Sequence, residues 1–368
     1  MKIVTVIGAR PQFIKAAAFS RVVKQTDGVE EVLVHTGQHF DSNMSDIFFE
    51  ELDIPQPKYN LGIAGGSHAE MTGNMMIELE KVFLSEKPDA VLVYGDTNST
   101  MAAALSAVKI HIPVIHVEAG IRMRTIDNPE EVNRIVTDHV STLLFTPTID
   151  ERRQLEKENI ADNVYEVGNI MYDSYLYAVS KQEHTSENSA FESFDGTKVN
   201  IPDKYYLMTC HRQENTFDDV PLKEILSAMN YLEYPTVYPV HPRNKERAAR
   251  LCKENGFNNI ILIKPVGYLE SVYLINNCEK IVTDSGGLQC EAFYAGKQCV
   301  TILEHVVWQQ TMVDNRNQLA HADAKDILLK LEAEQMVDDD YKPFGEGNAA
   351  EKIMNVLQKY ERDGKFNV

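Results

Sequence analysis

The first half of the chain alternates short apolar runs, rich in valine, isoleucine and leucine, with longer amphipathic stretches. Near-continuous apolar runs separated by helix-sized segments are typical of a parallel sheet that is buried on both faces. We therefore expect six strands in this half, over residues 2–9, 31–37, 90–96, 114–120, 142–148 and 163–168.

The pattern fades after Asp173, and residues 181–204 are polar, rich in Ser, Thr and Glu, with no sustained helical or strand period. Such a stretch is typical of a linker. Strand-like runs then return at residues 205–210, 236–240, 259–266, 280–284 and 298–303, and residues 348–360 carry the period of an amphipathic helix. The pattern predicts an α/β fold of two doubly wound, Rossmann-like domains, over residues 1–175 and 200–345, with a polar linker region at 181–204 and a closing C-terminal helix in 346–368.

Composition narrows the classes of function. The 368 residues include 36 Lys plus Arg against 55 Asp plus Glu, a net charge of −19, which opposes an extended nucleic-acid or membrane footprint. No apolar run is long enough for a membrane span or a secretory signal, so we expect a cytoplasmic protein. The five cysteines are odd in number and form no C-x-x-C pair, which favours buried thiols over disulfides or a metal site.

The first predicted domain carries its unusual residues just past the ends of its strands, where open α/β sheets bind ligands. In GARPQFIK, Gly8 permits a tight turn, Pro11 suits the first helical position, and Arg10 and Lys15 stand near a helix start that already favours an anion. The segment matches no established phosphate motif, and an arginine at such a place is more often a surface residue. Alone it favours a structural interpretation.

Acidic residues follow the next two strands. Asp96 ends VYGD and Glu118 ends HVE, which predicts two acids at one sheet edge, one strand apart. Asp96 could instead cap the helix that follows it. Glu130 and Glu131 come directly after a proline, where acids suit the start of a helix. Clustered carboxyl groups also suit general acid and base catalysis, so both interpretations stay open.

The second predicted domain places two histidines at strand ends, His211 before Arg212 and His241 before a proline. Neither has metal-ligand spacing, so proton transfer or phosphate binding is favoured over a metal site. In TDSGGLQCEA, the turn at residues 285–287 (Ser285, Gly286 and Gly287) offers backbone N–H groups at a helix start, and Glu291 could bind a ribose diol. The alternative for this turn is a purely structural tight turn.

Together these motifs resemble the non-hydrolysing UDP-N-acetylglucosamine 2-epimerases over almost the whole chain. The matching segments are GARPQFIK, HTGQH, VYGDTNST, HVEAG, PEEVNR, HRQEN, YPVHP and TDSGGLQCEA. The resemblance implies a glycosyltransferase-B architecture (UDP-glycosyltransferase/glycogen phosphorylase-like), usually dimeric, with UDP held mainly by the second domain. It also implies anti elimination of UDP to a 2-acetamidoglucal and re-addition to the opposite face, with no cofactor and no metal.

The resemblance assigns roles residue by residue. Asp96, Glu118, Glu130 and His211 match the family's catalytic residues. The residues that it places at the substrate are Arg10, Lys15, Glu131, Arg134, Arg212, His241, Val266 and Tyr268, with Ser285, Gly286 and Gly287 around the diphosphate and Glu291 at the ribose. The expected partner is a UDP-sugar together with a second copy of the chain, not a nucleic acid or a membrane.

Several departures leave the sugar open. The stretch from Glu118 to Glu130 is shorter than in common members, so Glu131 could take the place of Glu130. Leu303 stands where the family has an arginine. FDSNMSDIFFE and MTG look more like the branch that acts on UDP-2,3-diacetamidoglucuronate. Asp41 replaces a glutamine of the family's second nucleotide site, so no activation by substrate is expected.

Three other classes of protein would use related motifs. A hydrolysing epimerase would release free N-acetylmannosamine, and a glycosyltransferase would pass the sugar to an acceptor. A catalytically silent sensor would bind the nucleotide sugar without turnover. The match to the non-hydrolysing motifs argues against the hydrolysing epimerase. The number of acids argues against the glycosyltransferase, and the filled catalytic acid positions argue against the sensor.

Overall fold

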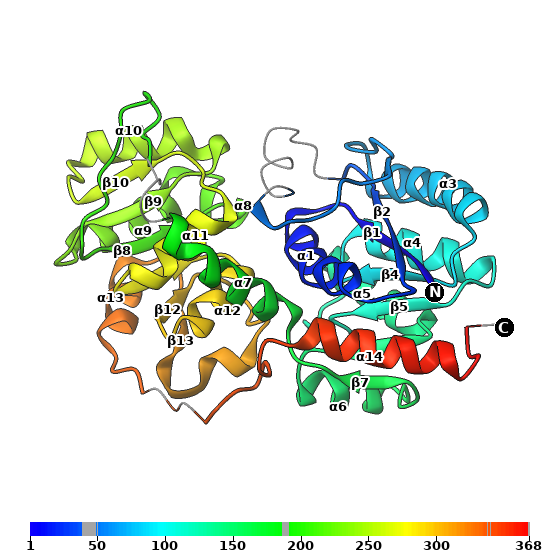
Figure 1. Cartoon of the computed structure of the whole chain (residues 1–368). Helices are drawn as coiled ribbons and strands as arrows, with labels where there is room; N and C mark the ends of the chain where they lie inside the picture. The colour runs from blue at the N-terminus through cyan, green and yellow to red at the C-terminus, as the bar shows by residue number, and fades with distance from the viewer. Residues whose placement is uncertain (39–48, 50, 186–190, 337, 339, 367–368) are drawn as a thin grey trace. The chain divides into compact units, whose positions relative to one another are not determined.

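A computed structural model describes residues 1–38, 49, 51–185, 191–336, 338 and 340–366. They form two compact units, Met1–Leu176 with Lys342–Val368, and Tyr177–Tyr341 (Figure 1). The chain leaves the first unit inside helix α7 (Ile170–Thr185) and returns to it at residue 342. Residues 186–190 of the predicted linker lie outside the described residues.

The first unit is built on a parallel sheet in the order β3-β2-β1-β4-β5-β6-β7. Its strands are β1 (Lys2–Ile7), β2 (Glu30–His35), β3 (Tyr59–Asn60), β4 (Ala90–Tyr94), β5 (Val114–Val117), β6 (Leu143–Thr146) and β7 (Val164–Glu166). All six expected strands are present. The two-residue edge strand β3 was not predicted, because it has no apolar run.

The helices of the first unit come from the chain both before and after the second unit. They are α1 (Arg10–Lys24), α3 (His68–Glu86), α4 (Asn98–Lys109), α5 (Pro129–Val140), α6 (Ile149–Lys157), α7 and the C-terminal α14 (Ala349–Arg362). Inward-facing valines of β1, β2 and β4 pack against apolar residues of α3 and α4 in one core. Helix α14 packs against α1, so the end of the chain completes the first unit.

The second unit repeats the plan with a parallel sheet in the order β10-β9-β8-β11-β12-β13. Its strands are β8 (Tyr206–Thr209), β9 (Thr236–Pro239), β10 (Ile260–Ile263), β11 (Lys280–Thr283), β12 (Gln298–Thr301) and β13 (Asn317–Leu319). Its helices are α8 (Gln213–Thr216), α9 (Asp219–Tyr231), η1 (Pro242–Asn244), α10 (Lys245–Asn255), α11 (Tyr268–Asn277), α12 (Gly286–Tyr294), η2 (Gln309–Asn315) and α13 (Ala324–Glu332). The five expected strands are present, and the edge strand β13 was not predicted.

Both sheets reverse their strand order at one point, between β1 and β4 in the first unit and between β8 and β11 in the second. Ligands of open α/β sheets bind outside the carboxyl ends of the strands at such a point. The loops that follow these four strands contain Gly8, Asp96, His211 and Ser285. The fold therefore brings the predicted residues to the two places where such sheets bind ligands.

No helix in the described ranges has both the length and the apolar character needed to cross a membrane.

Asp173 on α7 ties the C-terminal helix to the first unit. Its carboxylate accepts hydrogen bonds from the N–H groups of Ala349 (3.1 Å) and Ala350 (2.8 Å), at the start of α14. Burial nevertheless raises the pKa of Asp173 to about 6, outweighing these bonds.

We predict that this helix is held less firmly as the pH rises. A raised folded-state pKa contributes stability that is complete below the ordinary value of 3.8 and is lost as the pH passes about 6. The full change is about 3 kcal/mol. Asp173→Asn keeps an oxygen acceptor without the charge, so hydrogen exchange of α14, corrected for intrinsic rates, should lose this pH dependence between pH 4.5 and 7.5. An equal pH dependence in both proteins would contradict the prediction.

Candidate functional site

A buried glutamine joins the two loops at the strand reversal of the first sheet. The side-chain oxygen of Gln12 accepts from the N–H groups of Gly8 (2.8 Å) and Ala9 (3.1 Å). Its amide nitrogen lies within hydrogen-bond distance of the carbonyl of Tyr94 (2.9 Å), the hydroxyl of Thr97 in the next loop and the hydroxyl of Thr100 in α4. The loops after β1 and β4 are therefore fixed to one another.

The first loop differs in detail from the expectation. Helix α1 begins at Arg10, so Pro11 is its second residue. Gly8 does not need a left-handed conformation; a Cβ there would collide with the hydroxyls of Thr36 and Ser99. Glycine is required because β2 and α4 approach this backbone closely.

Lys15 and Glu118 form a buried ion pair. We expected Lys15 to stand near Arg10 at the helix start, but it points to the end of β5, while Arg10 is only half-buried. Gly95 lies beside the pair, since a Cβ there would be 3.3 Å from Lys15 Nζ and 3.4 Å from Glu118 Oε1. Glu118 itself has φ of 74°, a conformation that costs a residue with a side chain about 1 kcal/mol or more.

Asp96 pairs with Arg134 of α5. It does not cap the following helix, because Thr97 does so by accepting from the N–H of Thr100. Asn133 donates to the backbone carbonyl of Asp96 at 2.9 Å. Asp96 is therefore held from α5 by both its side chain and its backbone, one strand away from Glu118.

Glu131 and Glu130 have different surroundings. Glu131 is buried, and its carboxylate accepts from the N–H groups of Met123 (2.9 Å) and Arg124 (2.8 Å) and lies 3.4 Å from Arg134. Glu130 is exposed at the start of α5, where the side chain of Asn128 caps its N–H. Glu131 thus stabilises the loop at 121–128 through its hydrogen bonds. The carboxyl group of Glu130, in contrast, is accessible to a ligand.

In the second unit, His211 is oriented by Asp284. Its Nδ1 lies 3.0 Å from one carboxylate oxygen of Asp284, and the other oxygen accepts from the N–H groups of His211 and Arg212, each at 2.8 Å. Burial would raise the pKa of Asp284, but the hydrogen bonds and charge of His211 outweigh it, so this pKa lies below its ordinary value. Half of the His211 ring remains exposed, which suits a histidine that meets a ligand.

The glycine turn forms the start of α12. Ser285 caps this helix by accepting from the N–H of Leu288 at 3.3 Å. The first N–H groups of a helix point out of its end, which is an anion-binding arrangement. Glu291 is buried on the same helix, and the Trp308 side chain lies against Gly286. Leu303 is buried in the second unit.

The remaining predicted residues of this unit, His241, Arg212, Val266 and Tyr268, are partly or fully buried. His241 caps η1 through its Nδ1, which accepts from the N–H of Arg243 at 3.3 Å. Arg212 donates to the Asp284 carbonyl at 2.9 Å. Val266 is half-buried, and Tyr268 is 1% exposed at the start of α11.

Sequence reasoning missed Gln12, Asn133 and Asp284, although all three organise the predicted residues. Asp284 had one visible signal, its place at the end of an apolar run before Ser-Gly-Gly. The two others are polar residues inside helical patterns, which carry no such signal. Asp41, predicted to lack a role in a second nucleotide site, lies outside the described residues.

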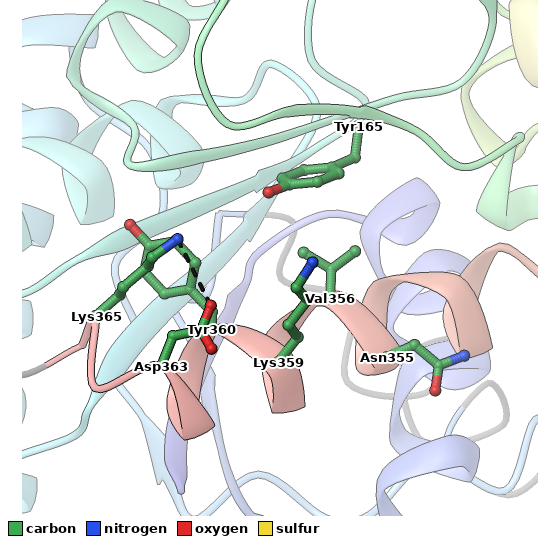
Figure 2. Close-up of a pocket in the computed structure, with 7 residues that line it drawn as sticks. All are labelled: Tyr165, Asn355, Val356, Lys359, Tyr360, Asp363 and Lys365. Atoms are coloured by element: carbon green, nitrogen blue, oxygen red, sulfur yellow. Dashed lines mark ion pairs between the residues drawn. The ribbon is translucent and has the colours of Figure 1, made fainter.

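A cavity of about 290 Å³ lies elsewhere in the first unit, between Tyr165 of β7 and helix α14 (Figure 2). Lys359, Asp363 and Lys365 also line it, and the last two form an ion pair. It contains none of the predicted site residues. Across the described residues, no group of three or more His, Cys, Asp or Glu side chains is placed to hold a metal ion.

Comparisons with known proteins show which family the chain is similar to. The model of the UDP-N-acetylglucosamine 2-epimerase family matches residues 21–358. A UDP-N-acetylglucosamine 2-epimerase homolog of Methanococcus maripaludis is 44% identical, over 97% of this chain and 99% of its own length. The UDP-2,3-diacetamido-2,3-dideoxy-D-glucuronate 2-epimerase of Pseudomonas aeruginosa is 43% identical, over 98% and 100%.

A solved structure is also similar. The UDP-GlcNAc 2-epimerase of Methanocaldococcus jannaschii, in complex with UDP-GlcNAc and UDP, has a TM-score of 0.82 at 36% identity, covering 98% of this chain and 100% of that one. The predicted fold class, with Rossmann-like domains of the glycosyltransferase-B kind, is confirmed.

The contrast between the two glutamates gives a stability prediction. Glu131→Gln removes a charge that serves two backbone N–H groups and Arg134, so it should lower the free energy of unfolding of the first unit by about 2 kcal/mol. The neighbouring Glu130→Gln is the matched control and should change it by less than about 0.5 kcal/mol. Hydrogen exchange of α5 and thermal unfolding measure both. Equal losses would show that Glu131 does not hold this loop.

Proposed function

The chain belongs to the UDP-N-acetylglucosamine 2-epimerase family, and from this premise we propose that it is a non-hydrolysing enzyme that interconverts UDP-N-acetylglucosamine, or a closely related UDP-2-acetamido sugar, with its C2 epimer. The epimer of UDP-N-acetylglucosamine is UDP-N-acetylmannosamine. As a member of the family the chain is an isomerase. We further propose that it works as a cytoplasmic homodimer and needs no cofactor.

The proposed reaction has two balanced steps. A base removes the proton from C2, the C2–H electron pair forms the C1=C2 bond, and UDP leaves with the electron pair of the C1–O bond. The 2-acetamidoglucal then accepts a proton at C2 on the opposite face, while a phosphate oxygen of UDP attacks C1. Inversion at C2 demands one proton-transfer group on each face of the sugar, because the proton leaves from one face and returns on the other.

The first unit supplies the proton-transfer groups. Asp96, Glu118 and Glu130 are carboxyl groups from the ends of β4 and β5 and the start of α5. Two of them have fixed cationic partners, Arg134 and Lys15. At the same sheet edge, we assign substrate binding to Arg10, Glu131 and Arg134. The proposal assigns both proton transfers to the three acids without dividing the faces between them.

The second unit supplies the UDP site. The start of α12 at Ser285, Gly286 and Gly287 would hold the diphosphate, and Glu291 the ribose. The backbone near Val266 and Tyr268 would hold uracil. His211, with Arg212 and His241, would bind the diphosphate as it leaves, where fixed donors and cations stabilise the developing charge.

One observation carries the proposal: the buried Lys15–Glu118 pair and the Asp96–Arg134 pair lie at adjacent strand ends, at the strand reversal of a sheet. A protein that only bound UDP would not need two such carboxylates there. Removing carboxylates from water is unfavourable for folding, and a role in proton transfer on the sugar explains why the chain places them there.

Incubation in deuterated water tests the proposal. With UDP-N-acetylglucosamine, NMR should show the C2 epimer forming reversibly, with deuterium at C2 and the UDP bond retained. Asp96→Asn should bind UDP nearly normally and turn over at least about 100-fold more slowly, because one proton-transfer group is lost. Undiminished turnover would remove Asp96 from the catalytic set.

Other products would identify other functions. Free N-acetylmannosamine would indicate a hydrolysing epimerase, and transfer only with an added acceptor would indicate a glycosyltransferase. Binding without turnover of any UDP-hexosamine would indicate a sensor.

A second candidate substrate, UDP-2,3-diacetamidoglucuronate, is favoured by Arg124. This residue is exposed, has φ of 60°, and its N–H is held by Glu131 at 2.8 Å. Within the described part of the chain its guanidinium enters no ion pair. An exposed guanidinium on a backbone that Glu131 holds would suit a sugar with a carboxylate at C6.

Arg124→Gln separates the two substrates. If the uronate is the substrate, the variant should raise its KM about 10-fold and leave the KM of UDP-N-acetylglucosamine within about two-fold, because only the uronate loses a charged partner. Arg153→Gln, a change of an exposed arginine on α6, is the matched control. Equal effects on both substrates would reject the uronate assignment.

A further inference from the structure

A chain of four ionisable side chains, three buried and one partly exposed, lies next to the acids of the first unit. His116 of β5 is fully buried, and its Nδ1 lies 2.7 Å from Asp138 of α5. The second Asp138 oxygen accepts from Arg122 at 2.7 Å, and Arg122 in turn binds both oxygens of Glu158, the residue directly after α6, at 2.8 and 2.7 Å. The proposed mechanism uses none of these four residues.

Both ring nitrogens of His116 face acceptors. The Nε2 atom lies 2.8 Å from the backbone carbonyl of Gly95, which can only accept. The other Asp138 oxygen accepts from Arg122 at 2.7 Å and from the N–H of Gly120 at 3.1 Å, two groups that can only donate. Paired in this way with the Arg122 guanidinium, Asp138 is a carboxylate, and its first oxygen also accepts. Two acceptors require a proton on each nitrogen of the ring.

His116 and Asp138 each bind backbone next to one of the two acids. The Gly95 carbonyl belongs to the peptide bond that joins Gly95 to Asp96. The same Asp138 oxygen that binds Arg122 accepts from the N–H of Gly120 at 3.1 Å, two residues after Glu118. Glu118 has a left-handed backbone, which persists only where its surroundings fix it.

A buried ionic network is a weak source of stability, since apolar residues of the same volume often serve as well or better. Its presence next to two acids therefore favours a role in the reaction. We propose that His116 is held doubly protonated between Asp138 and the Gly95 carbonyl and that it is a positioning residue for Asp96 and Glu118. The positioning part rests on the proposed epimerase function.

The protonation is tested without any assay of activity. In protein labelled with ¹⁵N at histidine, the His116 signals are identified by their loss in His116→Gln. At pH 7.5 each ring nitrogen should carry a directly bonded proton. One protonated and one bare nitrogen would overturn this part of the proposal.

The positioning is tested with two conservative variants. His116→Asn keeps a donor near the Nδ1 position and loses the bond to Gly95, whereas His116→Gln keeps a donor near the Nε2 position and loses the bond to Asp138. Each should lower kcat by about ten-fold or more, since small misplacements of catalytic groups are costly, and leave KM and UDP binding within about two-fold. The control is His139→Gln, because His139 is exposed on α5, the helix that carries Asp138. This variant should change neither kcat nor KM.

The outcomes separate this proposal from the proposed function. Folded variants with unchanged kcat would overturn the positioning role. A matched rise in KM, or loss of kcat only in proportion to loss of folded protein, would also overturn it, because it would indicate a structural role alone. Wild-type protein that turns over no UDP-hexosamine would reject the epimerase function, and the NMR result would still decide the protonation of His116.

Discussion

The buried ion pair of Lys15 and Glu118 is the constraint on which the first unit depends. Lys15 comes from the helix after β1 and Glu118 from the end of β5, so their pair spans the end of β4, which lies between those strands. Neither charge is tolerable there alone. Gly95 has φ of 63°, and a Cβ there would lie 3.3 Å from Lys15 Nζ, so a side chain at this position would be strained and would crowd the pair. Asp96 follows Gly95 directly. The position of one acid therefore fixes the position of the other.

The second unit uses a buried carboxylate in a different way. Asp284 fixes the loop after β8 through two backbone N–H groups and orients His211. The same strand order thus places acids at the loops of one unit and, in the proposed function, donors for a diphosphate at the loops of the other. In both units the charge that organises the loops lies at the strand reversal, where the loops have no neighbouring strand to satisfy their backbone groups.

The sequence predicted most of the sheets, because strands buried on both faces appear as apolar runs. It did not predict β3 or β13, which have two and three residues at sheet edges and no such run. It placed Asp96 and Glu118 at one edge but left open whether Asp96 caps a helix. It could not reveal Gln12 or Asp138, because a buried polar residue looks like a surface one until its partners are known. Gln12 binds the Tyr94 carbonyl 82 residues away, a separation that no local pattern reports.

The central claim is that C2 inverts through cleavage of the C1–O bond, with acids of the first unit moving the protons. Positional isotope exchange tests it most directly, with UDP-N-acetylglucosamine, or the uronate if that is the sugar accepted, labelled with ¹⁸O at the oxygen between C1 and phosphorus. Once UDP is detached, its terminal phosphate rotates, so the account predicts that the label moves into the non-bridging positions of that phosphate as the epimer forms. Epimer formed with all of the label still in the bridge would contradict it.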